Sequence, residues 1–357
     1  MNSNVKCYKP LVRAEDHWNW TKAKDGHLYH PAKVFSTDRL EEYQNKAEFG
    51  RYTYDLVPCG QCIGCRLENS RMWANRGYLE SLSSEHNYFV TLTYDDEWLT
   101  IPEEFTTEEG LTFTEIEELG WKGTLVPNEF KQFMNTLRKI FERDYNFTGI
   151  RFMGCGEYGE QGRRPHYHFI LFNCPFPAET FYNPRVNWEK NVYWQNTILE
   201  RAWTKGISNI TEANWNNIAY VARYVTKKMK GQDSEEFYAC QGEVKEFFRT
   251  SRDPGIGRDY YEAHKYEIYK NDKILIRNNK GNHWVTPPKY FDKLFEKECP
   301  ELFERVKKKR KKATIAALKV KAETTSLTQW EQLQIELATK EQQTLTLRRN
   351  RIEEVDR

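Results

Sequence analysis

The sequence contains no long apolar run and carries almost no net charge. None of its apolar stretches approaches the length of a membrane-spanning helix, and its first residues, Met-Asn-Ser-Asn-Val-Lys, lack the apolar core of a signal peptide. We therefore expect a soluble, cytosolic protein that has no membrane partner. The formal net charge of +2 means that overall charge does not indicate a nucleic-acid binder, so any attraction to DNA must come from local basic patches. No internal repeat is present, which excludes a repeat array.

Aromatic residues and cysteines are plentiful by contrast. Aromatic side chains make up 15% of the 357 residues although the mean hydropathy is low, so many rings are expected near the surface or in grooves, where they could stack on bases. The chain is long enough for a substantial core and for two domains. In a cytosolic protein the eight cysteines are expected to be thiols or metal ligands before disulfides.

The central motif is the stretch Arg-Pro-His-Tyr-His-Phe-Ile-Leu-Phe at residues 164–172. Its apolar and aromatic run predicts a buried strand with two histidines at its entrance. Because alternate side chains share one face of a strand, His166 and His168 are expected to point the same way and Tyr167 the opposite way. Two imidazoles on one face suit a divalent metal ion. The alternative is that both histidines only fill the sheet surface.

A carboxylate is predicted beside these histidines. Residues 149–157 resemble a strand that ends at Glu157, and a short glycine-containing loop leads back into the histidine strand, which predicts a hairpin. Glu157 and the two histidines would form a three-ligand site that leaves room for a substrate oxygen. Glu160 in the loop is a competing ligand. Arg163 and Arg164 at the same mouth favour an anionic substrate.

Three cysteines at two-residue gaps suggest a second metal site. Cys59, Cys62 and Cys65 are interleaved with glycines that allow tight turns, a pattern typical of thiolates around zinc. The local pattern contains only three ligands, and Cys7, Cys155 or a histidine could supply the fourth. A compact reduced loop that leads into a helix is the alternative.

A tyrosine pair lies on a predicted helix over residues 215–229. Tyr220 and Tyr224 are four residues apart and therefore share a face. Arg223 follows the first tyrosine by three residues, and Lys227 follows the second by three. A phenol is a poor nucleophile until a cation or a base is close to it, and each basic residue supplies that cation at helical spacing. An amphipathic helix that packs two tyrosines on a sheet is the alternative.

Hydrophobic periodicity also predicts the elements around these motifs. We expect strands over residues 88–94 and 206–210, and helices over residues 66–84, 127–143 and 191–204.

A turn-rich basic loop and a helical tail complete the chain. The loop over residues 249–257 could cradle phosphates with its backbone amides and with Arg249 and Arg252, or form a structural turn. From about residue 290 the composition shifts: residues 306–312 form a dense basic run, and residues 313–357 contain neither glycine nor proline. We expect a basic helical tail that contacts DNA or a partner, or that is simply solvated.

Taken together and in this order, the motifs resemble the HUH rolling-circle replication initiators. They look closest to the replication initiation proteins of microviruses of the gokushovirus type, which are small circular single-stranded DNA phages. The resemblance covers roughly residues 55–265 and is carried by four stretches: Pro58-Cys-Gly-Gln-Cys-Ile-Gly-Cys-Arg, Cys155-Gly-Glu-Tyr-Gly-Glu-Gln-Gly-Arg-Arg-Pro-His-Tyr-His, Tyr220-Val-Ala-Arg-Tyr-Val-Thr-Lys-Lys and Pro254-Gly-Ile-Gly.

The resemblance implies a fold and a metal site. The fold would be α+β, a central antiparallel sheet flanked by helices with a ferredoxin-like or RRM-like core, followed by the C-terminal helical tail. His166 and His168 would be metal ligands, with Glu157 as the acidic third ligand. The metal would be Mg²⁺ or Mn²⁺, in addition to structural Zn²⁺ at the cysteines if these bind it.

It also implies the catalytic residues. Tyr220 and Tyr224 would be the nucleophiles and Lys227 the assisting lysine. Arg223 departs from the expected lysine after the first tyrosine, and an arginine cannot shuttle a proton. This favours Tyr224 as the first attacker. The candidates for DNA contacts are Arg163, Arg164, Arg223, Lys228, Arg249 and Arg252.

The implied activity is that of a metal-dependent DNA endonuclease, a nickase, and strand transferase. Acting on a single-stranded or supercoiled origin in the host bacterial cytoplasm, it would form a 5′-phosphotyrosyl link and a free 3′-OH. A host polymerase would extend that 3′-OH, with a host helicase as a further partner. Two alternatives remain: a non-catalytic single-stranded DNA-binding protein and a metal-dependent phosphoesterase.

The expected domain organisation has four parts. Residues 1–58 would be an N-terminal extension and residues 59–230 the nickase domain with its cysteine-rich entry segment. Residues 231–300 would extend the catalytic domain, and residues 301–357 would form the basic helical tail.

Overall fold

The computed structural model of the chain describes residues 7–24, 26, 28–39, 51–99, 123–159, 163–187, 191–227, 238, 242–278, 281–328 and 331–342. The chain divides into two compact units. One comprises Ser3–Glu68 together with Ala313–Arg357, and the other comprises Asn69–Lys312. The histidine strand and the tyrosine helix both belong to the larger unit, whereas the clustered cysteines belong to the smaller one.

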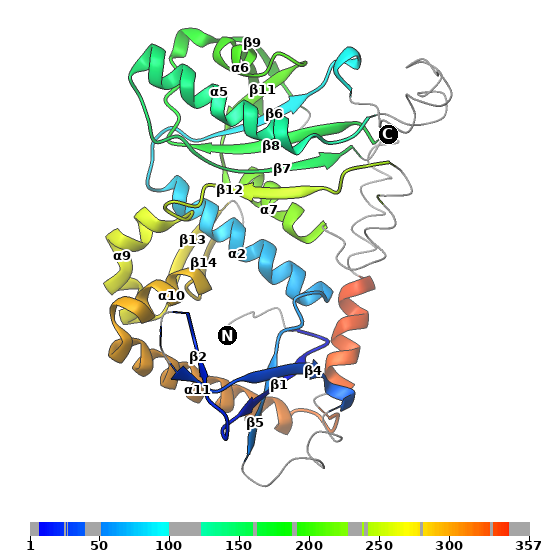
Figure 1. The fold of residues 1–357 in the computed structure, drawn as a ribbon, viewed down its shortest axis with the longest axis vertical. Coiled ribbons are helices and arrows are strands. Elements are labelled where there is room, and N and C mark those ends of the chain that lie inside the picture. Colours follow the sequence, from blue (N-terminus) through cyan, green and yellow to red (C-terminus); the bar gives the residue numbers. More distant parts are fainter. Residues whose placement is uncertain are drawn as a thin grey trace. The chain divides into compact units, whose positions relative to one another are not determined.

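A seven-stranded antiparallel sheet forms the centre of the larger unit (Figure 1). Its strand order is β12-β7-β8-β6-β11-β10-β9, so that β8 lies between β7 and β6. The bounds of the strands are Tyr88–Thr93 for β6, Arg151–Tyr158 for β7, Pro165–Phe172 for β8, Phe181–Val186 for β9, Val192–Asn196 for β10, Ser208–Glu212 for β11 and Phe247–Thr250 for β12.

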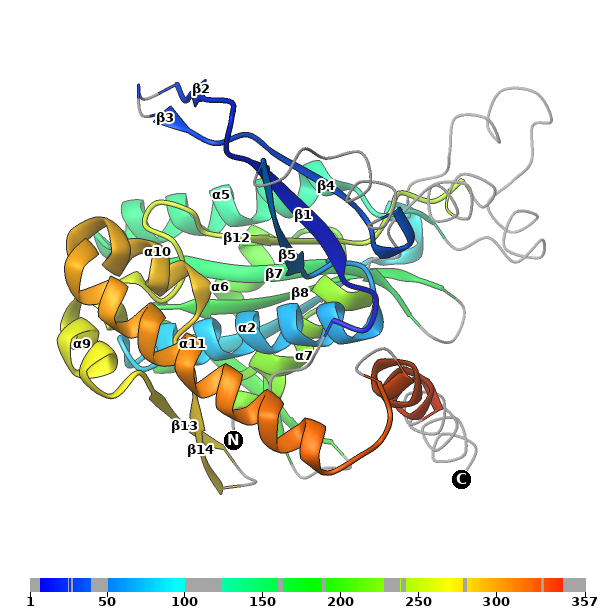
Figure 2. The same ribbon diagram turned by 90° about the horizontal axis from the view of Figure 1, so that it is seen from below.

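Alternate residues of the central strands feed two separate cores. The face that carries Tyr167 and Phe169 packs against helix α5 (Pro127–Tyr145) and helix α6 (Thr197–Ala202). The opposite face, which carries Ile170, packs against helix α2 (Ile63–Ser81) and helix α7 (Trp215–Lys227). Figure 2 shows α5 on one side of the strands and α2 and α7 on the other. The side chains of the histidine strand are thus divided between two environments.

Helix α5 has clear start and stop signals in the sequence. It begins at Pro127, whose missing N–H is not needed in the first turn, and ends at Asn146 in the left-handed conformation with φ 49°. Its buried stripe recurs at helical spacing, and Phe130 stacks on Phe169 of β8 with ring centroids 4.3 Å apart.

A helical layer completes the larger unit around an aromatic core of its own. The layer contains α9 (Arg258–Asn271), α10 (Lys289–Glu298) and the first part of α11 (Pro300–Glu323), with the hairpin of β13 (Ile274–Asn278) and β14 (Gly281–Val285). Tyr269 stacks on Phe295 with ring centroids 3.9 Å apart. Arg310 holds the layer together through ion pairs with Asp272 and Asp292.

The smaller unit has a three-stranded antiparallel sheet and little core. The sheet order is β4 (Ala32–Ser36), β1 (Leu11–Asp16), β5 (Tyr52–Val57), beside a two-stranded ribbon of β2 (Thr21–Lys22) and β3 (Leu28–Tyr29). The buried residues of this sheet are Val12, Ala14 and Phe35. A helix over residues 331–342 also belongs to this unit. Short 3-10 turns are η1 (Thr37–Arg39) here and, in the larger unit, η2 (Asp96–Trp98) and η3 (Ala178–Thr180).

Most elements predicted from periodicity are confirmed, and the α+β class with its large antiparallel sheet is confirmed with them. The helix expected over residues 191–204 is wrong in its first half, because Val192–Asn196 is strand β10 and only Thr197–Ala202 is helical. The cause is local: Asn196 accepts hydrogen bonds from the backbone N–H groups of Ile198 and Leu199 and starts the helix there. Within the described ranges, no helix is both long and apolar enough to cross a membrane.

A buried ion pair should be a large contributor to the stability of the larger unit. Glu80 of α2 is 3% exposed, pairs with Arg151 of β7 and accepts the backbone N–H of Gly257 at 2.5 Å. We expect Glu80→Ala to lower the free energy of unfolding by about 3–5 kcal/mol, because it leaves the Arg151 guanidinium, 13% exposed, without its carboxylate. Urea unfolding measures this. The exposed Glu85→Ala control should change it by less than about 0.5 kcal/mol, and equal effects of the two variants would contradict the assignment.

Candidate active site

The β7–β8 hairpin brings Glu157 beside both histidines. Glu157 is the register partner of His166, and Cys155, two residues earlier on the same face, is the partner of His168. The Oε1 atom of Glu157 lies 2.7 Å from Nε2 of His166 and 2.9 Å from Nε2 of His168. The predicted hairpin and its gathering of three side chains are therefore observed. Glu157 is 2% exposed and His168 is 7% exposed, so the group lies at the protected end of the strand pair.

Both imidazole rings are oriented through their other nitrogen. Nδ1 of His166 lies 3.1 Å from the carbonyl oxygen of Arg164, and Nδ1 of His168 lies 2.9 Å from Oγ1 of Thr91 on β6. A carbonyl oxygen can only accept, so Nδ1 of His166 carries the proton. Nε2 of a neutral His166 then presents a lone pair to the carboxylate, an arrangement that calls for a cation. Phe89 stacks on the His168 ring with centroids 5.2 Å apart and fixes its plane.

The three side chains fit a divalent cation. Their ligand atoms, two imidazole nitrogens and a carboxylate oxygen, lie within 4.8 Å of one another. The second carboxylate oxygen of Glu157, Oε2, is buried and has no hydrogen-bond partner in the part of the chain that the structure describes. A buried oxygen of this kind needs a compensating group, and a bound cation would supply one. Imidazole and carboxylate together suit several divalent ions, so the ligand set does not specify which one.

Glu157 is ionised at neutral pH. Burial by itself would raise the pKa of its carboxyl group, but hydrogen bonds and charges from His166 and His168 outweigh burial and lower the pKa to about 2. The site therefore offers a fixed negative charge to a cation.

The tyrosine helix lies directly over this group. Asn214 starts α7 by accepting hydrogen bonds from the backbone N–H groups of Asn216 and Asn217. One turn later the hydroxyl of Tyr220 donates to Oε1 of Glu157 at 2.9 Å, and the hydroxyl of Tyr224 donates to that of Tyr220 at 2.8 Å. Burial, followed by the charge of Glu157, raises the pKa of Tyr220 well above its usual value. The two phenols and the carboxylate form one hydrogen-bonded chain.

The basic candidates are placed less uniformly. Arg223 is exposed and lies over the ring of Tyr220, with its guanidinium carbon 5.4 Å from the ring centroid. Arg163 is paired with Glu243, and Arg164 donates to the carbonyl of Tyr94 at 2.7 Å and pairs with Asp96 at 2.6 Å. The positive charges expected at the mouth of the hairpin are thus engaged within the protein.

The remaining basic candidates are not gathered at the group. Arg249 of β12 lies over Phe247, on the sheet face that packs against α5 and not on the histidine face. Arg252 is exposed in the turn after β12. Lys227 is the last residue of α7, but its side chain, Lys228 and Glu160 lie outside the described residues.

The cysteines form a second group, remote in sequence from the first. Cys59, Cys62 and Cys65 are joined by Cys7, with all four sulfur atoms within 4.8 Å of one another. Of the candidates for the fourth position, the structure brings Cys7 into the group, whereas Cys155 is buried beneath α7.

Sequence reasoning missed the residues of β6 that support the histidines. Thr91 and Phe89 both face the metal-binding group because β6 pairs with β8 in the register Thr91↔His168. The alternation of strand 88–94 indicates that these residues share a face. The sequence contains no signal for which strand lies next to them.

The comparisons with known proteins agree with this geometry. A family model for the replication-associated protein ORF2 matches residues 87–229, which include the histidine hairpin and both tyrosines. The chain is 37% identical over 262 residues to the replication-associated protein ORF2 of Spiroplasma virus 4, covering 72% of this chain and 74% of that protein. It is 28% identical over 249 residues to the replication-associated protein VP4 of Bdellovibrio phage phiMH2K, covering 68% and 69%.

A third relative extends the same pattern. The replication-associated protein ORF4 of Chlamydia phage 1 is 26% identical over 269 residues, which cover 74% of this chain and 59% of that protein. No solved structure matches the chain. The chain therefore belongs to the ORF2 family of phage replication-associated proteins, and the resemblance to microvirus replication proteins is confirmed.

Metal binding at this group can be measured directly. We expect His168→Ala to lower the affinity for Mn²⁺, used as a paramagnetic probe, by about 100-fold because a ligand is lost. Thr91→Val should lower it about 10-fold because the His168 ring loses its orienting partner. Electron paramagnetic resonance of free Mn²⁺ gives both values.

The matched control is His86→Ala, which removes an exposed histidine of the same unit and should leave the affinity unchanged. Mn²⁺ affinity that is equal in all three variants would show that the probe binds elsewhere.

Proposed function

We propose that this protein initiates rolling-circle replication by nicking one strand of circular phage DNA with a tyrosine nucleophile. The observation that carries the proposal is the hydrogen-bonded chain from Tyr224 through Tyr220 to Glu157, which places two phenols at a three-ligand metal-binding group. Membership of a family of phage replication-associated proteins supports a role in replication initiation. Family membership itself does not specify the reaction.

The proposed reaction is a transesterification at phosphorus. The tyrosine oxygen forms a bond to the phosphorus atom, and the bond from phosphorus to the 3′ oxygen of the preceding nucleotide breaks. The phenol loses one proton and the departing oxygen gains one, so the products are a 5′-phosphotyrosyl link and a free 3′-OH. A Mg²⁺ or Mn²⁺ ion, when bound, would polarise the phosphate and offset the negative charge that disfavours a phenolate. Because the link conserves the phosphodiester energy, the strand can later be rejoined.

The sequence favours Tyr224 as the first attacker, but the contacts of the two hydroxyls lead us to propose the reverse order. The Tyr220 hydroxyl is hydrogen-bonded to a metal-ligand candidate, whereas that of Tyr224 is one hydrogen bond further away and Tyr224 is only 3% exposed. Arg223 disfavours Tyr220 only as a proton donor or acceptor. Its charge over the Tyr220 ring favours the phenolate.

Tyr224 and Lys227 would serve the second half of the cycle. After a round of synthesis, Tyr224 attacks the regenerated origin and releases a new 3′-OH. That 3′-OH attacks the phosphotyrosyl link of Tyr220, which frees Tyr220 and closes a unit-length circle. We propose Lys227 as the proton donor to departing oxygens, because a lysine can lose its charge and an arginine cannot.

The same proposal assigns the sheet to the HUH type and the substrate to DNA. The histidine pair on the central strand β8, covered by the tyrosine helix, is the arrangement that this assignment rests on. Exposed Arg223 and Arg252 are the proposed phosphate contacts, together with Lys228. Host polymerase and helicase are the expected partners of the nicked origin.

Trapping the covalent adduct tests the proposal. With Mn²⁺ and single-stranded oligonucleotides tiled across the circular genome that encodes this chain, we expect an adduct whose DNA-linked peptide contains Tyr220. Tyr220→Phe should abolish it because the attacking oxygen is gone. Tyr224→Phe should retain first cleavage and lose circle closure. The His166→Ala/His168→Ala double variant should lose cleavage, and Glu157→Gln should need more metal.

Controls separate the other interpretations. Tyr266→Phe, at an exposed tyrosine of α9, should behave as the unmodified protein. An adduct only at Tyr224 reverses the order of attack. Metal-dependent cutting without any adduct indicates a phosphoesterase, and DNA binding without cutting indicates a non-catalytic binding protein.

A further inference from the structure

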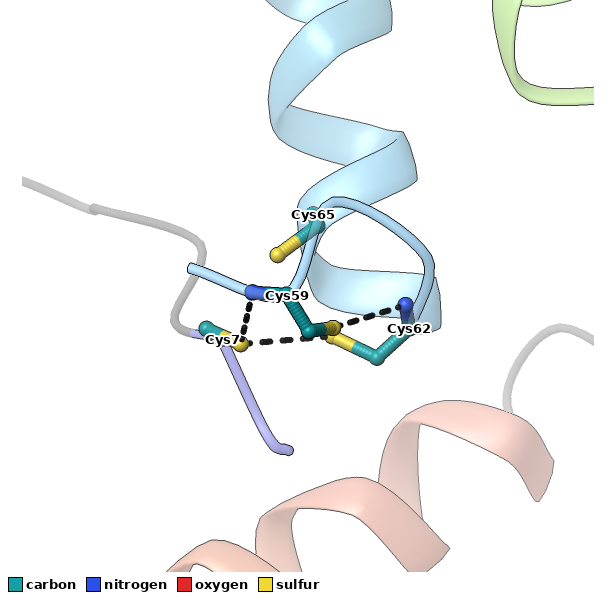
Figure 3. Close-up of side chains that lie close together, drawn as sticks. All are labelled: Cys7, Cys59, Cys62 and Cys65. Atoms are coloured by element: carbon teal, nitrogen blue, oxygen red, sulfur yellow. Dashed lines mark hydrogen bonds between the residues drawn. The ribbon is translucent and has the colours of Figure 1, made fainter. Parts of the chain in front are cut away.

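We propose that Cys7, Cys59, Cys62 and Cys65 together bind one structural zinc ion, a site separate from the proposed nickase centre. The four cysteines come from two segments: Cys7 precedes β1, and the other three lie between the end of β5 and the first turn of α2. Figure 3 shows their sulfur atoms turned toward one another. Tetrathiolate zinc sites of the closed, structural kind use this ligand set.

The sulfur spacing fits a metal ion better than disulfides. Sγ of Cys7 and Sγ of Cys62 are 3.9 Å apart, and all four sulfur atoms lie within 4.8 Å of one another. A tetrahedral ion with Zn–S bonds of about 2.3 Å separates its sulfur ligands by roughly 3.8 Å. A disulfide would require about 2.05 Å, and none of the cysteines in the described ranges forms one.

Backbone amides are aimed at the sulfur atoms. The N–H groups of Gln61 and Cys62 donate to Sγ of Cys59 at 3.4 and 3.3 Å, in a turn that Gly60 makes with a φ of 74°. The N–H of Cys59 donates to Sγ of Cys7 at 3.2 Å, and that of Tyr8 donates to Sγ of Cys62 at 3.4 Å. Such donors stabilise thiolates, the form of cysteine that binds metal. The loop is therefore arranged around four negative sulfur atoms.

The smaller unit has a physical need for such a site. Its sheet buries only three residues, too few for a hydrophobic core to hold a fold of this size alone. The cysteines lie just beyond the pair Leu11↔Val57, where β1 and β5 end side by side. Leu333 and Leu337 of the helix over residues 331–342 pack against the same cluster. One ion would fasten the first strand, the start of α2 and this helix to one another.

The metal content is measured on the full-length His166→Ala/His168→Ala variant, so that zinc at the histidine group does not contribute. We expect about one zinc per chain by elemental analysis. Substitution with Co²⁺ should give the absorption spectrum of a tetrahedral four-thiolate site. Cys7→Ser in this background should lose the zinc or convert the cobalt spectrum to a three-thiolate one. Cys299→Ser, a matched control at a half-buried cysteine of the larger unit, should change neither.

Chelation gives an independent readout of the structural role. Removal of zinc should expose the chain between residues 323 and 331 to limited proteolysis and leave Mn²⁺ binding by the unmodified histidine group intact. The cobalt spectrum of the parent variant reports the number of thiolates even if Cys7→Ser fails to fold. A folded, metal-free protein that is insensitive to chelator overturns the proposal, as do two disulfides or an iron–sulfur cluster at these cysteines. None of these outcomes bears on the tyrosine adduct.

Discussion

A buried, ionised carboxylate at the end of β7 is the constraint around which the candidate site is arranged. Leaving such a charge uncompensated in the interior is strongly destabilising. Glu157 is compensated by the Nε2 atoms of His166 and His168 and by the hydroxyl of Tyr220. The register of β7 with β8 and the position of α7 over both strands are each needed for these contacts. Metal affinity, phenol placement and local stability therefore depend on the same carboxylate.

Much of this site could be predicted from the sequence because its geometry is local. Period-two alternation places His166 and His168 on one face, a short loop closes the hairpin onto Glu157, and helical spacing puts Tyr220 and Tyr224 on one face. None of these inferences requires knowledge of a distant contact. The regular helices, such as α5 with its apolar stripe and proline start, were predictable for the same reason.

The parts that could not be predicted depend on partners far away in the chain. Thr91 reaches His168 only because β6 pairs with β8, 77 residues apart, and Cys7 meets Cys59 only because β1 pairs with β5. The strands of residues 11–57 have short, mixed patterns that carry no clear period. The order of the two tyrosines likewise depended on which hydroxyl meets Glu157, and spacing along the helix cannot reveal that.

The pairing of β7 with β8 also acts as a check on folding. A slip of one residue would turn Tyr167 and Phe169 toward α7 and press the histidines into the aromatic core beneath α5. Such a molecule would bury imidazoles among phenylalanines and strand Glu157 without cations, so it would be selected against before any DNA is met. The same alternation thus ties correct folding to a complete site. In a purified sample, the fraction that is natively folded and the fraction that is competent to bind metal should be nearly the same number.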